Sequence, residues 1–518
     1  MIGFKLDKVL VAMLAVYVLV LATTINNPPH ADESTHAFVG MLIKDLTADL
    51  IKNPTLSFTK IYDYAMSYLA YYPKISLHYP PLPQTLFSIA YSMLGVSLQV
   101  SRMVSIILSL LLVIVVYKFS QAVFNNRAVS LLASAMTMTS TIIFNMSILA
   151  MQEISFVLFF TLTMFWLYLV RGKEGLRDYL ILGILMAATI LTKWQAITII
   201  PVVFVYSVIE RKLFKRTLLA FVVTALLLSP YYLILWKTNL LLLPFTANLE
   251  ADPLDPTFMQ LEGWTYYIRA LLTEQFFLPV GIIVLASALF YITKKNKGWK
   301  FFATWSLVIF VIMVILHNKD ARYTINFIPA LVIPASYTIY RVSQKIGNMN
   351  LLLFLMVGML ITQGLLAYIN LIQGFKDVEA ISKFITNDKE GSILVNTGLG
   401  TESTFIFEIA RNSNFTHQVF RPCTIEFLEE SPADLVEKFR IKYIIVDKNF
   451  QSFTEKQKEF TKFITINGNF SLAKDYERFS LLQNNNYEEV DTNEMCNYVC
   501  ATREFTCSKF KYPSDALK

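Results

Sequence analysis

The chain has 518 residues, of which 55% are hydrophobic and only 16% are charged. A soluble globular chain is usually about one quarter charged, and the mean hydropathy here is positive at +0.49, so the composition excludes an ordinary soluble protein. The net charge of +7 does not indicate nucleic-acid binding, because the basic residues form short clusters between apolar runs, as membrane topology requires.

Apolar runs recur along the chain at roughly the 17–23 residues that a helix needs to cross a hydrocarbon core. The first run follows Lys5 and Lys8, but no small-residue cleavage site and soluble domain come after it, so we interpret it as a retained span and not as a signal peptide. The sequence predicts eleven transmembrane helices, at 9–25, 103–121, 128–147, 154–170, 179–192, 195–209, 217–236, 276–293, 301–316, 324–340 and 350–371.

The charges of the connecting loops predict the orientation of these spans. Every second connection is basic, as cytoplasmic loops are, and most of the others carry acidic residues. We therefore expect a multi-pass plasma-membrane protein with a cytoplasmic N-terminus; the endoplasmic reticulum membrane, with the lumen as exterior, is the alternative. The basic connections lie at 5–8, 127, 171–177, 211–216, 294–300 and 341–345.

The first external loop, residues 26–83, is long and contains amphipathic stretches such as 38–50, which are typical of helices that lie in the membrane interface. Its many tyrosines fit the aromatic belt of that interface. The apolar segment 84–98 follows, and at about 15 residues it is short for a crossing. Counting it as a span would invert every later loop, so we predict a re-entrant or surface-lying helix there.

After residue 372 the pattern changes to that of a small α/β domain. The predicted fold class is therefore a polytopic α-helical membrane protein with a transmembrane domain at 1–372 and an extracytoplasmic α/β domain at 373–518. Within the second domain, strands are predicted at 392–396 and 443–446, and helices at 376–386, 402–411 and 431–439.

All four cysteines, Cys423, Cys496, Cys500 and Cys507, lie in this last domain. An oxidising compartment explains that distribution, so disulfides are the favoured interpretation over a zinc site made by three of them with His417. Four cysteines allow three pairings, and the sequence does not choose among them.

An acidic pair, Asp32 and Glu33, follows the first span on the predicted external side, and His36 lies one helical turn further on. A carboxylate near the membrane surface can accept the proton of an incoming hydroxyl group, since its pKa is readily tuned by its neighbours. The alternative is that both acidic residues only cap the helix that begins there.

Other ionisable residues in apolar surroundings map to the same predicted side. An ionised group costs a few kcal/mol at the bilayer centre, so such residues usually have a function. Cations there can stabilise a departing lipid phosphate, with snorkelling of the long side chains to the interface as the alternative. The residues are Arg102, Glu153, Lys193, Lys319 and Arg322.

Several short motifs occur in a fixed order between residues 5 and 340. They are Asp32-Glu-Ser-Thr-His36, His78-Tyr-Pro-Pro-Leu82, Arg102-Met-Val-Ser105, Glu153, Leu191-Thr-Lys193, Trp264-Thr-Tyr-Tyr267 and Lys319-Asp-Ala-Arg-Tyr323. This ordered set resembles the GT-C class of membrane glycosyltransferases, above all its branch of protein O-mannosyltransferases and aminoarabinose transferases, which uses polyprenyl-phosphate sugars.

The resemblance implies that Asp32 is the catalytic base, with Glu33 beside it. It also implies that basic residues near the external surface hold the lipid phosphate. The substrate-binding residues that it implies are His36, His78, Arg102, Glu153, Lys193, Lys319 and Arg322.

The sequence departs from the family pattern in three places. The histidine after the acidic pair stands at Asp32 plus four where the pattern has plus three, one residue separates His78 from the prolines, and position 153 is glutamate where many relatives have aspartate. Some branches use a divalent metal. Oxygen and nitrogen ligands are present, but no spacing requires a metal site, so the cofactor stays open; the candidate ligands are Glu33, His78, Glu250 and Asp252.

The predicted function is that of a membrane hexosyltransferase. It moves a sugar, mannose-like by resemblance, from a polyprenyl- or dolichyl-phosphate donor to an external protein, lipid or glycan acceptor, with inversion at the anomeric carbon. The alternatives are a lipid or sugar transporter, which would show internal repeats, and a non-catalytic subunit on the same scaffold. An oligosaccharyltransferase is disfavoured, because no tryptophan follows Trp305.

Overall fold

A computed structural model describes residues 7–517 except 55–56, 74–78, 238–254, 347–348, 372–373, 389, 399–400, 428–430, 450–452, 467, 488–494, 500–503 and 509–511. The chain divides into two compact units. The helical unit contains residues 1–25, 78–83 and 102–372, and the α/β unit contains 26–77, 84–101 and 373–518. The first-loop residues 26–77 and the segment 84–101 thus differ from the predicted division at 372, because they pack with the C-terminal residues.

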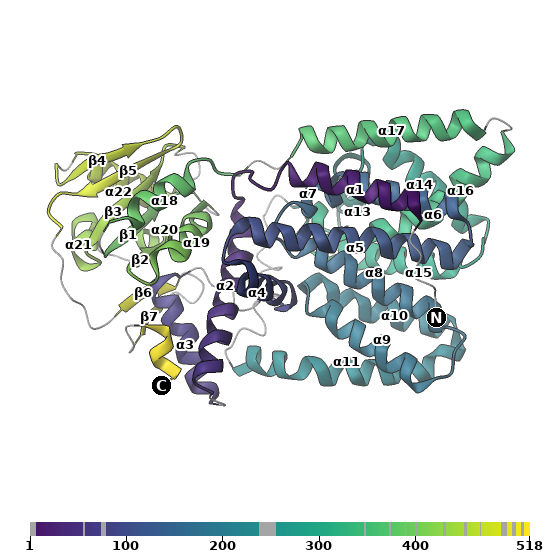
Figure 1. The fold of residues 1–518 in the computed structure, drawn as a ribbon, viewed down its shortest axis with the longest axis horizontal. Coiled ribbons are helices and arrows are strands. Elements are labelled where there is room, and N and C mark those ends of the chain that lie inside the picture. The colour runs from purple at the N-terminus through teal and green to yellow at the C-terminus, as the bar shows by residue number, and fades with distance from the viewer. Residues whose placement is uncertain are drawn as a thin grey trace. The chain divides into compact units, whose positions relative to one another are not determined.

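The helical unit has a helix at each of the eleven predicted spans (Figure 1). Its elements are α1 (Lys8–Ala22), α5 (Leu98–Phe124), α6 (Arg127–Thr139), α7 (Thr141–Ser147), α8 (Glu153–Val170), α9 (Leu176–Ile190), η1 (Trp194–Thr198), α10 (Ile199–Ile209), α11 (Arg211–Lys237), α13 (Leu261–Ala270), the π-helical turn η2 (Leu271–Gln275), α14 (Leu278–Thr293), α15 (Trp299–Ile315), η3 (Ala321–Thr324), α16 (Phe327–Lys345) and α17 (Met349–Ile369).

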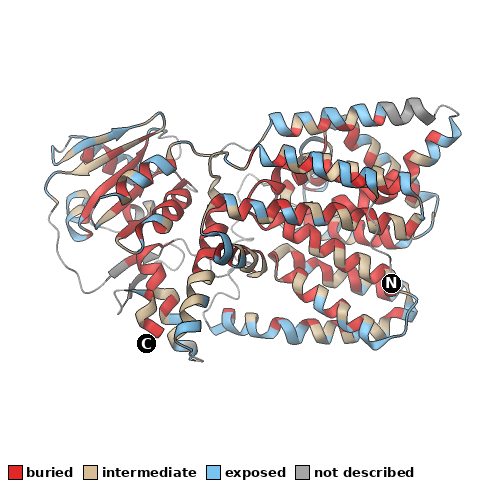
Figure 2. Ribbon diagram, viewed as in Figure 1, coloured by how far each residue is buried: buried red, intermediate tan, exposed pale blue. Residues whose placement is uncertain are grey.

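Three helices of the described residues, α5, α8 and α11, are long and apolar enough to cross a membrane, and the pair α6–α7, bent by 65°, would make a fourth. Shorter apolar helices include α1, α14 and α15. Figure 2 shows many exposed residues along α11 and α17, and on α11 they include Val222 and Leu226. Apolar side chains on the outside of a helix suit contact with lipid. The number of spans stays a prediction.

The α/β unit contains a five-stranded sheet of order β2-β1-β3-β5-β4 and a separate hairpin, β6–β7. Strand β1 is parallel to β2 and β3, and β5 is antiparallel to β3 and β4. The strands are β1 (Gly391–Asn396), β2 (His417–Phe420), β3 (Ile441–Asp447), β4 (Phe470–Asp475), β5 (Phe479–Asn484), β6 (Met495–Val499) and β7 (Glu504–Ser508).

The unit that contains the sheet also contains helices from the first external loop and from the C-terminal part of the chain. Residues such as Leu394, Phe420, Ile444 and Phe460 form a fully buried core, because β1 and β3 are continuous apolar runs in the middle of the sheet. The helices are α2 (Ala31–Lys52), α3 (Phe58–Tyr71), α4 (Leu82–Leu94, in this unit from Gln84), α18 (Val378–Thr386), α19 (Thr401–Ser413), α20 (Pro422–Phe427), α21 (Pro432–Lys438), α22 (Glu455–Ile466) and η5 (Pro513–Leu517).

The first external loop differs from its predicted interfacial role. Tyr68, Tyr71 and Tyr72 of this loop are buried, and all three rings contact Phe415 of the C-terminal part. The amide of Gln418 donates to the carbonyl of Ala70 at 2.9 Å. These tyrosines therefore belong to a protein core, because helix α3 has a partner more than 300 residues away in the sequence.

Helix α4 covers most of the apolar segment 84–98 and is amphipathic. Phe87 and Tyr91 are buried, whereas Ile89 and Met93 are 55% and 79% exposed. The helix ends before Gly95, whose φ of +84° is the left-handed value that favours glycine. A short helix with one buried and one exposed apolar face is compatible with the predicted surface-lying segment.

Candidate active site

The first turn of α2 carries the acidic pair. The helix begins after two prolines, and His30 is its N-cap: the His30 Nδ1 atom accepts from the Asp32 amide at 3.3 Å. The Glu33 carboxylate accepts from the His30 amide at 2.7 Å, which completes a capping box. Of the two alternatives for the acidic pair, capping thus applies to Glu33.

Asp32 lies at the second helical position and is exposed, whereas Glu33 is fully buried. The capping box is made by the side chains of His30 and Glu33 and does not involve the Asp32 carboxylate. A carboxylate at a helix N-terminus is stabilised by the helix dipole. The geometry therefore gives Glu33 a structural role in the cap and leaves Asp32 on the solvent-exposed side of the first turn.

The surroundings of Glu33 include residues that the sequence did not single out. Helix α19 packs on α2, and its Glu408 forms a 2.5 Å ion pair with Arg411. Burial raises the pKa of the Glu408 carboxyl group. Tyr91 of α4 lies within electrostatic range of both Glu33 and Arg411. No sequence signal links these residues, because they come from three separate segments.

His36 is buried in α2 and lies beside α4. One of its ring atoms, Nδ1, is 3.0 Å from the amide nitrogen of Gln84. The contact ties the two helices where Gly40 lets them approach closely: a Cβ atom at Gly40 would lie 3.0 Å from that of Phe87. This placement assigns His36 a packing contact within the α/β unit.

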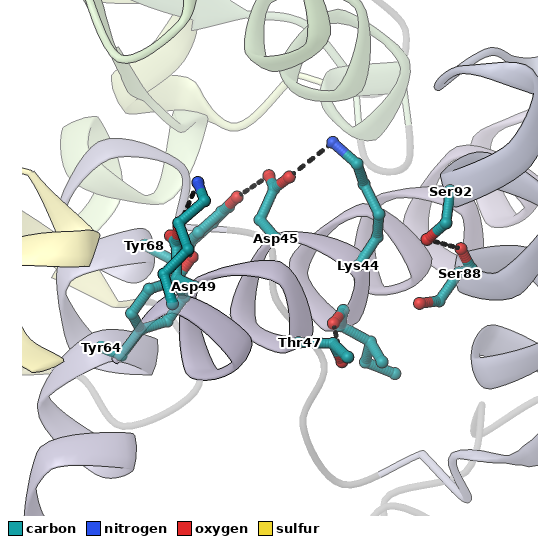
Figure 3. A network of polar contacts seen from close by, with 10 residues as sticks. Lys44, Asp45, Thr47, Asp49, Tyr64, Tyr68, Ser88 and Ser92 are labelled. Carbon is teal, nitrogen blue, oxygen red and sulfur yellow. Dashed lines mark hydrogen bonds and ion pairs between the residues drawn. The ribbon is translucent and has the colours of Figure 1, made fainter. Parts of the chain in front are cut away.

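The second half of α2 carries another polar network, which Figure 3 shows in close-up. Asp45 accepts from Tyr68 and pairs with Lys44 at 2.8 Å, and Asp49 accepts from Tyr64 at 3.1 Å. Burial, together with these carboxylates, raises the pKa of the Tyr64 and Tyr68 hydroxyls, so both remain donors. The network fixes α3 on α2 and thereby supports the helix that carries Asp32.

In the helical unit, Glu153 and Lys193 form a buried ion pair at 2.6 Å. Glu153 is the first residue of α8, and Lys193 lies between α9 and η1. The Lys193 ammonium group also lies 5.4 Å from the ring centre of Tyr323. The structure thus joins two residues that the sequence treated separately and adds Tyr323, the last residue of the 319–323 motif.

The segment before α4 is anchored beside this ion pair. The Gln152 amide donates to the carbonyl of Pro80 at 3.2 Å, and the Leu82 amide donates to the carbonyl of Leu191 at 2.9 Å. The partners therefore lie next to Glu153 and near Lys193 in the sequence. The Tyr-Pro-Pro-Leu part of the second motif lies against the two helix junctions that carry the ion pair.

Arg322 and Asp320 form a second charged pair in the same loop region. The Arg322 guanidinium donates to one Asp320 oxygen at 2.7 and 2.8 Å, while the Arg322 amide donates to the other. The side chain of Arg322 is 30% exposed. Tyr323 lies within electrostatic range of this pair and of Glu153. The guanidinium group of Arg322 is therefore partly accessible to solvent.

Lys319 is occupied by backbone carbonyls. Its ammonium group donates to Met313 at 2.9 Å, to Val314 at 2.7 Å and to Leu316, at the C-terminal end of α15. An ammonium has three N–H donors, so this set uses all of them. Burial lowers the pKa of Lys319 to about 8, against the opposing effect of Asp255. Lys319 caps α15.

Arg102 is only 1% exposed, and its guanidinium donates to the carbonyl of Ile25 at 2.9 Å. This bond ties α5 to the residues just after α1. His78 lies outside the described residues, as do Glu250 and Asp252. Within the described part of the chain, no three His, Cys, Asp or Glu side chains are grouped so as to hold a metal.

Three of the four cysteines lie within the described residues. Cys423 is disulfide-bonded, Cys496 and Cys507 are directly opposite one another in the β6–β7 register, and Cys500 lies outside the described residues.

Comparison with known proteins gives matches of two kinds. Residues 78–236 match the family model described as Dolichyl-phosphate-mannose-protein mannosyltransferase. An uncharacterized protein of Aquifex aeolicus (strain VF5) is 24% identical over 310 residues, and the match spans 58% of this chain and 60% of that protein.

Solved structures match over nearly the whole chain. ArnT from Cupriavidus metallidurans in the apo state has a TM-score of 0.66 at 14% identity and covers 93% of this chain and 99% of its own; its form bound to undecaprenyl phosphate has 0.64 at 13%, covering 92% and 98%. The oligosaccharyltransferase AglB from Archaeoglobus fulgidus, in complex with an inhibitory peptide and a dolichol-phosphate, has 0.60 at 11%, covering 93% and 75%.

These matches confirm the resemblance predicted from the sequence. The chain has the helical GT-C fold, and the matched family and structures are glycosyltransferases. The matched family model and the AglB match name sugar transferases, the class that the sequence predicts for this chain, and the solved structures show the fold.

Proposed function

We propose that the protein transfers a single mannose-like hexose from a polyprenyl- or dolichyl-phosphate donor to a hydroxyl group of an external acceptor. The family description names dolichyl-phosphate-mannose. Of the matched structures, one of ArnT is bound to undecaprenyl phosphate, and that of AglB is in complex with a dolichol-phosphate and an inhibitory peptide. The shared chemistry is a long isoprenoid phosphate, which fits a chain with many apolar helices.

Asp32 is the general base in this proposal. It removes the proton of the acceptor hydroxyl while that oxygen attacks the anomeric carbon from the side opposite the phosphate. The bond between the anomeric carbon and the phosphate oxygen breaks, the lipid phosphate leaves with the electron pair, and the configuration inverts. The observation that carries the proposal is the exposure of Asp32 on the first turn of α2, next to the buried capping residue Glu33.

The cations divide in a similar way. Arg322 is partly exposed, so we assign the donor phosphate to its guanidinium, whereas Lys193 is buried and paired with Glu153 and supports the site. A guanidinium is suited to bidentate contact with phosphate oxygens. Lys319 and Arg102 have carbonyl partners and low exposure, and we assign them to the scaffold.

The packing of the α/β unit supports the proposed topology of eleven spans with a cytoplasmic N-terminus. Residues 26–77 and 373–518 belong to one compact unit, so both must lie on the same side of the membrane. An even number of crossings between them satisfies this, and ten of the predicted spans lie there. Counting 84–98 as a further span would separate them. The unit is then extracytoplasmic, at a plasma membrane.

The test uses purified protein in lipid with radiolabelled polyprenyl-phosphate mannose and, separately, glucose, and a membrane extract as the acceptor pool. We expect transfer of mannose to an acceptor, with the anomeric configuration of the product opposite to that of the donor by NMR. Retention of configuration would contradict the single-displacement mechanism. Transfer of glucose but not of mannose would contradict the proposed identity of the sugar. Transport of the donor without any transfer would favour the transporter alternative.

A further inference from the structure

The C-terminal domain contains a cavity of about 500 Å³ that none of the proposed chemistry uses. It lies between α21, α22 and the strands β4 and β5. Its wall combines amide side chains with aromatic rings, a composition that can hydrogen-bond hydroxyl groups and pack against sugar rings. The lining residues include Phe463, Asn469, Phe470, Asn484, Asn486 and Tyr487.

The amides are held in place by one another. Asn486 donates its side-chain amide to the Asn469 oxygen at 3.1 Å, and its backbone amide donates to the Asn484 oxygen at 3.0 Å. Asn484 in turn donates to the carbonyl of Ile441 at 3.1 Å. Each side chain keeps further donor or acceptor capacity, since an amide can make four hydrogen bonds. The wall is therefore a fixed polar surface.

The cavity wall carries one charge of each sign, from Arg440 and Glu437. Arg411, Arg421 and Arg478 of the same unit each pair with a carboxylate, whereas no carboxylate among the described residues pairs with the exposed Arg440 guanidinium. Its backbone has a φ of +48° just after α21, where glycine is the favoured residue. Because the turn itself needs no side chain at this position, the Arg440 side chain is not required for the backbone conformation.

A second depression adjoins the first. It is more open, at about 540 Å³, and shares Phe463 with the cavity. Its lining residues include Glu459 and Lys462, one charge of each sign. The two together offer room for several linked rings, so a chain of sugars fits better than a single one.

We propose that this cavity binds an acidic oligosaccharide, whose carboxylate or phosphate group pairs with Arg440 while the amides and rings hold the sugar. The site is distinct from that of the proposed transfer, and its occupancy requires no transfer. In an enzyme with the proposed function it would hold a glycan-bearing acceptor; failure of one claim leaves the other standing.

The experiment measures binding of hexagalacturonate, an acidic sugar chain, and of maltohexaose, a neutral one of equal length, to the full chain in lipid nanodiscs by calorimetry. We expect saturable binding of hexagalacturonate and weaker binding of maltohexaose. Arg440→Gln should weaken the binding of hexagalacturonate roughly tenfold or more, the loss typical of a charge-assisted contact. The affinity for maltohexaose should not change. Lys458→Gln is the matched control, because this exposed lysine pairs only at the surface with Glu455 and lies outside the lining.

Arg440→Gly separates binding from folding. Glycine adopts the left-handed backbone of position 440 without strain, so this variant should lose hexagalacturonate binding while its Tm stays equal or rises. Equal affinity of wild type and Arg440→Gln, or no saturable binding of hexagalacturonate, would overturn the proposal. Equal affinity for both sugar chains would overturn its acidic part.

Discussion

The charged residues of the helical unit and those at the start of α2 stand in opposite environments. Glu153 and Lys193 are buried against each other, and Lys319 is surrounded by carbonyls. Asp32, in contrast, is exposed on the first turn of a helix that its neighbours cap. The contrast teaches that ionisable residues at one predicted surface differ in burial: some are held inside the protein, whereas Asp32, which we propose as the base, is open to solvent.

The largest effect on stability should come from the buried ion pair. Lys193→Met leaves the Glu153 carboxylate without its 2.6 Å partner, and an uncompensated buried charge costs about 3–5 kcal/mol. We expect a strong fall in Tm of the detergent-solubilised protein. The double variant Lys193→Met with Glu153→Gln should recover most of it, because the charge is gone. If the single variant Lys193→Met is as stable as wild type, the ion pair does not contribute to stability and the prediction is wrong.

A smaller effect, confined to donor binding, is expected for Arg322. Arg322→Gln removes the partly exposed guanidinium but leaves Asp320 to cap η3. A charge-assisted contact to phosphate contributes about 1.5–3 kcal/mol, so the donor Kd should rise roughly ten- to hundredfold in a binding titration with polyprenyl-phosphate sugar. Lys319→Gln is the comparison: it should lower Tm and leave the donor Kd nearly unchanged. If Lys319→Gln raises the donor Kd and Arg322→Gln changes only Tm, then Lys319 binds the donor phosphate and Arg322 belongs to the scaffold.

Helix packing allows the two units to be compared directly. An added Cβ at Gly183 would lie 2.7 Å from the Ala220 carbonyl oxygen of α11, while at Gly40 the nearest atom would be 3.0 Å away. Overpacking of this kind costs about 1–3 kcal/mol. We expect Gly183→Ala to lower Tm more than Gly40→Ala, measured in the same detergent. Gly358→Ala, which meets nothing within 4 Å, is the control and should not lower it.

The smallest effect concerns pH. The pKa of Lys319 is lowered to about 8 from 10.5, chiefly by burial, so the unfolded chain binds more protons between these values. Stability should therefore rise as pH increases from about 8 to about 10.5, by roughly 1–2 kcal/mol. The difference in Tm between wild type and Lys319→Met, followed across this window, isolates the contribution. If this difference in Tm does not change with pH, the three carbonyls stabilise the ammonium charge of Lys319 as well as water does.

Much of the helical unit was predictable, because long apolar runs fix the positions of helices regardless of their partners. The Glu153–Lys193 pair was not, since it depends on how the junction before α8 meets the one after α9. His30 also escaped notice as the N-cap, because serine, threonine, aspartate and asparagine are the usual caps.

The first loop was the least predictable region. Tyrosines at helical spacing have the same composition whether they lie at a membrane surface or in a core. Which applies to Tyr68 and Tyr72 depends on Phe415, more than 300 residues away. The exposure of Asp32 against the burial of Glu33 likewise required the capping geometry.

The measurement that tests the central claim most directly is single-turnover transfer by Asp32→Asn, with donor binding and Tm recorded on the same preparation. The variant should bind donor as wild type does and keep its Tm, while the transfer rate falls by roughly 10²–10⁴, the usual contribution of a general base. Asp49→Asn, the same change in the last turn of α2, should transfer at the wild-type rate. If Asp32→Asn also transfers at that rate, Asp32 is not the base.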